Sequence, residues 1–412
     1  MSWEGSLLAG AHRVVFLGDS ITYSGQYVDD LQMLLRNFPK GTEFEILDLG
    51  LPSETVSGLT EPGHANGSFP RPNLHDRLPR LLETVRPDLV IACYGMNDGI
   101  YYPFDAIKFE KFQRGVRLLR ERVLKAKAQL ILMTPPVFDP VPIRNRTLPA
   151  GLSEYRRPYE GYNDVLDRYS DWLLDQRTNG WPVIDIHFPM NDYLKQRRRG
   201  NPEFVLASDG VHLDDTGHWL IAQALLHGLR IPVYDSGAVV DLKAGKSGGM
   251  GDTREFHKLE GEVSFVWSTR PPMPWPGFGM EFTFHKTRMF FPAQGQSHLL
   301  IARNGQAPTY RLFEKEELLA TLSREDLARG LDTRGFDRLI TTDRGRTILH
   351  LTHTRNRILS DAWLTFVGHE RPGMAKGLPI DEAKARAASV DRQIEELSRP
   401  VDLHLRLVAL PN

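Results

Sequence analysis

Short apolar runs that stop at glycine or a polar residue recur along the first half of the chain, and they restrict the fold more than any other feature. They occupy residues 13–17, 44–49, 88–94, 129–134 and 183–186, and segments with helical spacing lie between them at 27–35, 108–124 and 162–174. Apolar runs of this length are typical of buried parallel strands, and strand–helix alternation implies right-handed crossovers with helices on both faces. The sequence therefore predicts an α/β fold with a flavodoxin-like, three-layer α/β/α parallel sheet.

Residues that could take part in catalysis stand immediately after three of these apolar runs. Ser20 follows Gly18 and Asp19 after the first run, Gly50 ends the second, and Asn97 belongs to a Gly-x-Asn-Asp segment after the third. The carboxyl ends of parallel strands meet at one edge of the sheet, which is where ligands bind in open α/β folds. The backbone N–H groups of Ser20 and Gly50 and the side-chain amide of Asn97 are the kind of donors that stabilise an oxyanion.

A base for the serine is found much later in the chain, in the segment Asp209-Gly210-Val211-His212. A serine hydroxyl needs a base within hydrogen-bond reach, and that base needs an orienting partner. A carboxylate three residues before a histidine can accept from its Nδ1–H and leave Nε2 facing the serine. The alternative is that Asp209 only caps the helix expected over residues 216–222.

These four blocks, in this order, resemble the SGNH, or GDSL-type, hydrolase superfamily over residues 1–232. The resemblance implies a serine ester hydrolase in which Ser20 is the nucleophile, Asp209 and His212 complete the catalytic triad, and Ser20, Gly50 and Asn97 form the oxyanion hole. One departure concerns the shape of the pocket, because the family often has a further glycine soon after the second block, whereas residues 51–55 here read Leu-Pro-Ser-Glu-Thr.

The segments around Ser20 and Asn97 are most similar to carbohydrate-esterase and acetylesterase members. This similarity implies removal of a short acyl group, most readily acetyl, from a carbohydrate or a similar small alcohol. Two alternatives stay open: a thioesterase or lysophospholipase-type acyl hydrolase, and, from a different class, a non-catalytic carbohydrate-binding protein. A small-molecule or oligosaccharide ester is the expected partner, and a homo-oligomer is left open.

Two long segments, 61–75 and 135–159, are expected to border the acyl-acceptor pocket, because long loops inside compact domains are often functional. His64 and Tyr155 on these segments, with Asp19 and Asp98 beside the strand ends, are candidates for substrate binding.

Several other classes of protein are disfavoured. A formal net charge of −1 gives no overall positive potential that would attract nucleic acid. No apolar run reaches the length of about 18 residues that a membrane span requires. One cysteine and the lack of a His-Glu-x-x-His helix argue against a metal site, and no cofactor is implied. No export signal is visible, so a cytoplasmic location is the default unless a leader has been removed.

A chain of 412 residues exceeds what one hydrophobic core usually supports, so two domains are expected. Residues 1–232 are predicted to form the catalytic domain and 233–412 an accessory α+β region. Within the latter, 233–257 are expected as a linker, 258–335 as a β-rich module and 336–412 as a helical tail with a terminal strand. Aromatic residues of the module, Trp267 and Trp275 among them, suit either core packing or a platform for sugar rings.

Overall fold

The computed structural model describes the chain except for residues 1–4, 37–43, 150–156, 232–235, 275–297 and 411–412. The described residues divide into two compact units. The first comprises the described parts of Met1–Pro232 together with Thr352–Val390, and the second those of Val233–Thr287, Pro292–Leu351 and Asp391–Asn412.

A parallel five-stranded sheet forms the centre of the first unit. Its strands are β1 (Arg13–Gly18), β2 (Glu45–Asp48), β3 (Leu89–Cys93), β4 (Gln129–Met133) and β5 (Val183–Ile184), and they lie in the order β2-β1-β3-β4-β5. This is the flavodoxin-like order, and the strands are almost entirely buried, as expected when helices cover both faces. The predicted α/β class and all five predicted strands are confirmed.

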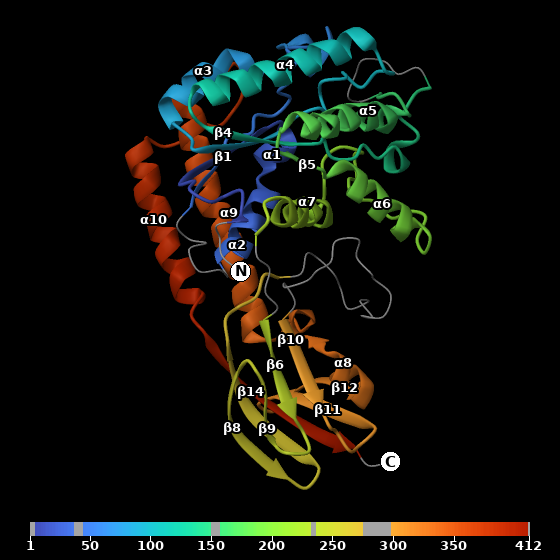
Figure 1. The fold of residues 1–412 in the computed structure, drawn as a ribbon, viewed down its shortest axis with the longest axis vertical. Coiled ribbons are helices and arrows are strands. Elements are labelled where there is room, and N and C mark those ends of the chain that lie inside the picture. The colour runs from blue at the N-terminus through green and yellow to red at the C-terminus, as the bar shows by residue number, and fades with distance from the viewer. Residues whose placement is uncertain (1–4, 37–43, 150–156, 232–235, 275–297, 411–412) are drawn as a thin grey trace. The chain divides into compact units, whose positions relative to one another are not determined.

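Helices cover the sheet, and Figure 1 shows α3 and α4 on one side of β1 and β4 and α2 and α7 on the other. Their bounds are α1 (Ser20–Ser24), α2 (Gln26–Arg36), α3 (Leu74–Val85), α4 (Ala106–Lys125), α5 (Tyr162–Asp175), α6 (His187–Arg198) and α7 (Asp215–Gly228), with 3-10 turns at η2 (His64–Gly67), η3 (Val141–Ile143) and η4 (Gln176–Asn179). The sequence did not predict α3, whose pattern contains Pro79. Nevertheless α3 buries Leu74, Leu78 and Leu81, and Asn73 accepts a hydrogen bond from His75 N at its start.

The first unit also contains residues that the sequence assigned to the accessory region. Two long helices, α9 (Ile340–Val367) and α10 (Ile380–Leu397), contribute their parts within 352–390. On α9, His353 Nδ1 and Asn356 Nδ2 each lie 2.7 Å from a carboxylate oxygen of Asp29 on α2, and Ser360 Oγ donates to Asp48 O at 2.6 Å. The predicted boundary at 232 therefore separates segments that pack together, because the partners of α9 lie more than three hundred residues earlier in the chain.

The second unit contains two sheets. They have the orders β13-β10-β6-β7 and β12-β11-β14-β9-β8. The strands are β6 (Ser236–Asp241), β7 (Lys246–Met250), β8 (Asp252–Leu259), β9 (Glu262–Thr269), β10 (His298–Arg303), β11 (Thr309–Glu314), β12 (Glu317–Ser323), β13 (Leu331–Asp332) and β14 (Val401–Leu410), with α8 (Arg324–Arg329) and η5 (Thr333–Gly335).

Three of these strands fall in or overlap the segment 233–257, which the sequence predicted as a linker, so that prediction is wrong. Its glycines occupy strands and turns instead: Gly248 lies in β7, where a Cβ would come within 2.5 Å of Val239 Cγ1. Trp267 belongs to the core of this unit and is 1% exposed. Trp275 and the strand candidates at 280–284 and 288–291 lie outside the described residues.

Candidate active site

Ser20 is the first residue of α1, directly beyond the carboxyl end of β1. Asp19 caps this helix, because its Oδ1 accepts from Ile21 N at 3.0 Å. The turn between strand and helix is tight, and a Cβ on Gly18 would lie 2.0 Å from Thr22 Oγ1. The Gly-Asp-Ser sequence thus lets the chain reverse sharply and presents the serine hydroxyl at the edge of the sheet.

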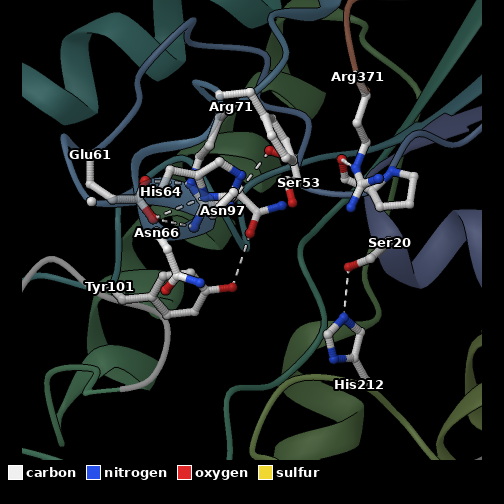
Figure 2. A pocket seen from close by; sticks show the side chains of 14 residues that line it. Ser20, Ser53, Glu61, His64, Asn66, Arg71, Asn97, Tyr101, His212 and Arg371 are labelled. Carbon is white, nitrogen blue, oxygen red and sulfur yellow. Dashed lines mark hydrogen bonds and ion pairs between the residues drawn. The ribbon is translucent and has the colours of Figure 1, made fainter. Parts of the chain in front are cut away.

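The structure brings Ser20, His212 and Asp209 together in one hydrogen-bonded line. Ser20 Oγ lies 2.8 Å from His212 Nε2, and His212 Nδ1 lies 2.7 Å from Asp209 Oδ2 (Figure 2 shows the first of these contacts). An ionised carboxylate can only accept, so Nδ1 carries the hydrogen and Nε2 is free to accept from the serine hydroxyl. Asp209 Oδ1 also accepts from the backbone N–H of His212 at 2.8 Å, which fixes the short Asp-x-x-His turn.

The electrostatic surroundings of His212 favour its charged form. Burial alone lowers the pKa of the imidazole, but the hydrogen bond and negative charge of Asp209, with the more distant Asp19, raise the pKa above its ordinary value of 6.5. A carboxylate that favours the imidazolium is what a general base needs, because that cation forms when the base accepts a proton.

Asn97 is held with its amide at the same edge. Its Nδ2 donates to Glu54 O at 3.2 Å, and its Oδ1 accepts from Tyr101 OH at 3.0 Å, the second of which is drawn in Figure 2. A primary amide carries two hydrogens, so one remains for a ligand. Asn97 lines the same cavity as Ser20 and His212.

Gly50, by contrast, does not line this cavity. Its N–H donates to Asp48 Oδ1 at 2.9 Å, and a Cβ at this position would lie 2.4 Å from Tyr23 N. The glycine therefore allows the end of β2 to approach α1 closely. Ser53 lines the cavity, with a backbone φ of +69°, a conformation that glycine adopts most easily.

The cavity has a volume of about 450 Å³, within the usual range for small-molecule sites. The segment 61–75 forms much of its wall, as expected, whereas no described residue of 135–159 lines it. Its lining residues are Ser20, Pro52, Ser53, Glu61, Gly63, His64, Ala65, Asn66, Phe69, Arg71, Asn97, Tyr101, His212 and Arg371.

The four candidates for substrate binding have different positions. His64 lines the cavity, and its Nδ1 lies 3.3 Å from Glu61 Oε1. Asp19 and Asp98 are buried behind the cavity and do not line it, and burial raises the pKa of each carboxyl to about 6. Asp98 instead accepts from Ser57 N at 2.8 Å. Tyr155 lies outside the described residues.

Sequence reasoning did not single out three cavity residues: Ser53, Arg371, and Arg71, which lies within the expected wall segment 61–75. Arg71 Nε lies 2.6 Å from Oε2 of Glu61, which is ten residues earlier in the chain. Arg371 belongs to the segment that follows α9. The positive φ of Ser53 follows from the course of the loop, and no local pattern marked any of the three.

Among the described residues, no group of three or more His, Cys, Asp or Glu side chains could hold a metal ion. Within the same residues, no helix is both long and apolar enough to span a bilayer.

Comparison with known proteins gives one family match. Residues 16–220 match the GDSL-like lipase/acylhydrolase family. This part of the chain is therefore an SGNH hydrolase, and the protein is a carboxylic ester hydrolase. No curated protein matches the chain.

Solved structures show how far the fold is shared. The gut microbial diltiazem-metabolizing enzyme BT4096 is 16% identical, with a TM-score of 0.70 over 97% of this chain and 98% of that one. This likeness shows a common fold that extends beyond the family match. The acetylxylan esterase Axe2 from Geobacillus stearothermophilus is 20% identical, covering 54% of this chain and 95% of its own, with a TM-score of 0.40. A catalytic mutant of Axe2 gives 19% identity, 53% and 94% coverage and a TM-score of 0.39.

Proposed function

We propose that the protein removes a short acyl group, acetyl above all, from a carbohydrate or a similar small alcohol, through an acyl-enzyme formed on Ser20. The observation that carries this proposal is the line of contacts from Ser20 Oγ to His212 Nε2, at 2.8 Å, and from His212 Nδ1 to Asp209 Oδ2, at 2.7 Å. These contacts join the nucleophile, the base and the orienting carboxylate of serine hydrolysis.

The reaction proceeds in two steps. Ser20 Oγ bonds to the ester carbonyl carbon while His212 Nε2 takes the hydroxyl proton, and the alcohol then leaves with that proton as its bond to the acyl carbon breaks. Water attacks the acyl-enzyme in the same way and releases the acid and the free serine. Asp209 stabilises the imidazolium in both steps.

The oxyanion is held by the N–H of Ser20, the Nδ2–H of Asn97 and a backbone N–H from the loop after β2. We assign this last donor to Ser53 rather than to Gly50. Support comes from the cavity, which Ser53 lines and Gly50 does not, and from the Gly50 N–H, which Asp48 already accepts. Donors aimed at the developing charge are the largest single contribution in many such sites.

The cavity wall supports a short acyl group. Four residues supply apolar lining, namely Pro52, Ala65, Phe69 and the ring of Tyr101, and mostly polar side chains occupy the other positions. A long acyl chain gains about 0.8 kcal/mol for each CH₂ that it buries, so it would compete with the alcohol part of the substrate for these four residues, whereas an acetyl group needs little of that surface. Long-chain esters and lysophospholipids are accordingly expected to be poorer substrates than acetyl esters.

The test is acetate release from acetylated xylooligosaccharides, alongside p-nitrophenyl esters of increasing chain length. Ser20→Ala should lower kcat by more than about 10³-fold. Ser24→Ala is the matched control, because the Ser24 hydroxyl bonds to Ile21 O and His218 Nε2 outside the cavity. Turnover that survives Ser20→Ala, or a preference for octanoate, acyl thioesters or lysophospholipids over acetate, would contradict the proposal.

A further inference from the structure

Arg371 reaches the wall of the active-site cavity from the segment that follows α9. Its Nε donates to Pro52 O at 2.9 Å, and its guanidinium carbon lies 5.5 Å from the centre of the Phe69 ring. Pro52 and Phe69 line the same cavity. Figure 2 shows the side chain extending toward Ser20 from the side opposite His212. Arg371 lies beyond the family match at 16–220, but Pro52 and Phe69 inside that match hold it within the first compact unit, called the catalytic unit below.

The other charged groups around Arg371 have partners of opposite charge. Arg71 and Glu61 form a buried two-point ion pair, at 2.6 and 2.8 Å, on the cavity wall. Glu370, the chain neighbour of Arg371, pairs with Arg80 at 2.8 Å. Among the described residues, no carboxylate lies within the 4.0 Å of an ion pair from Arg371. The cavity therefore contains one arginine whose positive charge is not balanced by an acidic side chain.

The hydrogen-bonding groups of this guanidinium are also incompletely used. Its Nη1 has only long contacts, of 3.4 Å, with Pro372 O and Met374 Sδ. Nη2 makes no hydrogen bond within the described part of the chain. Arg371 is partly buried, and this burial lowers its pKa. A partly desolvated cation without a counter-charge gains most from an anionic ligand.

We propose that Arg371 determines specificity by binding a carboxylate on the alcohol part of the substrate, so that the preferred ester is an acylated uronic acid or a similar hydroxy acid. This inference rests on the proposed function, because it names the acceptor of the same reaction. The carboxylate belongs to the alcohol because an acetyl group has no room for one. A carboxylate accepts from two parallel N–H groups of a guanidinium edge, and a phosphate on the acceptor is the alternative that the experiment separates.

The experiment compares O-acetylated galacturonic acid with its methyl ester, which has the same ring and acetyl group but no negative charge. The wild type should hydrolyse the acid with a kcat/KM about tenfold higher or more. Arg371→Gln should remove that preference, because KM for the acid rises relative to KM for the methyl ester. Arg371→Lys should restore part of the preference, because it keeps the charge but loses the planar fork.

Arg80→Gln is the matched control, since it removes an exposed arginine that contacts the same segment outside the cavity. Arg80→Gln should leave kcat/KM for both esters unchanged. Equal rates on the two esters, an equal loss on both in Arg371→Gln, or a stronger preference for an acetylated sugar phosphate would each overturn the proposal.

Binding separates this proposal from the proposed function. Calorimetric titration of the acetylated galacturonate into Ser20→Ala should show binding that Ser20→Ala/Arg371→Gln weakens about tenfold. If wild type hydrolyses neither ester but this difference in affinity persists, the proposed function fails and the role of Arg371 stands. If acetyl esters are hydrolysed but the two variants bind the acid equally, only the role of Arg371 fails.

Discussion

Replacing Arg77 by methionine should destabilise the catalytic unit strongly, because it breaks an ion pair from which water is excluded. Arg77 and Glu54 are both 0% exposed, with Nε–Oε1 and Nη2–Oε2 distances of 2.6 and 2.7 Å. Arg77 Nη2 also donates to Leu49 O at 2.8 Å, and Tyr94 OH donates to Glu54 at 2.6 Å. Removing the arginine leaves the buried Glu54 carboxyl without its counter-charge and the carbonyl of Leu49 without this donor.

The expected cost is about 3–5 kcal/mol, the usual penalty for removing one partner of a buried pair. For a unit of this size each kcal/mol lowers Tm by about 2–4 °C, so Tm should fall by about 6–20 °C. The active site should suffer too, because Glu54 O accepts from Asn97 Nδ2 at 3.2 Å and Ser53 directly precedes Glu54. We therefore expect a lower kcat/KM even below the transition.

Scanning calorimetry of the full chain measures the change, and loss of esterase activity on heating shows which transition belongs to the catalytic unit. Arg114→Met is the control: its pair with Glu110 is 70% and 66% exposed, and the loss should stay below about 0.5 kcal/mol. Glu54→Leu combined with Arg77→Met should cost less than the two single changes added together, because neither charge is left alone. A Tm for Arg77→Met within about 2 °C of wild type would refute the reasoning.

Three further outcomes are expected. Asn97→Ala should lower kcat by about 10²–10³-fold with little change in KM on p-nitrophenyl acetate, and an unchanged kcat would remove Asn97 from the oxyanion hole. The proposed mechanism requires neutral His212, whose pKa is raised by Asp209; kcat/KM should therefore be full at high pH and fall as pH drops through a midpoint above 6.5, whereas a midpoint below 6 would contradict this. Gly50→Ala should cost about 1–3 kcal/mol in thermal or urea unfolding, because its Cβ would lie 2.4 Å from Tyr23 N, and an unchanged Tm would argue against that close approach.

Much of the first unit is predictable from local patterns. Each strand of the parallel sheet is a short apolar run that can be recognised without its neighbours, and strand–helix alternation with right-handed crossovers accounts for a parallel sheet covered on both faces. Ser20 and Asn97 were found because they follow such runs. Asp209 and His212 were found because three-residue spacing brings a carboxylate to the imidazole of the same turn.

Two features were not predicted in segments that contain glycine or proline, residues that usually interrupt strands and helices. The glycines of 245–249 predicted a linker, yet β7 forms there by pairing with β6, a contact that depends on another segment. No helix was predicted over α3, which contains Pro79 and is held by the leucines that it buries. In both cases packing outweighed the local preference.

The sequence alone determined the strands of the sheet and predicted the candidate nucleophile and its base, because each of these inferences depends on residues close together in the chain. Tertiary structure alone decided that Ser53 rather than Gly50 faces the cavity, and that residues 352–390 pack with the catalytic unit. It also decided that Arg371 contacts Pro52 across more than three hundred residues. The physical reason is that periodicity reports which face of an element is buried, whereas the course of a loop and the partner of a distant helix depend on contacts that no local pattern records.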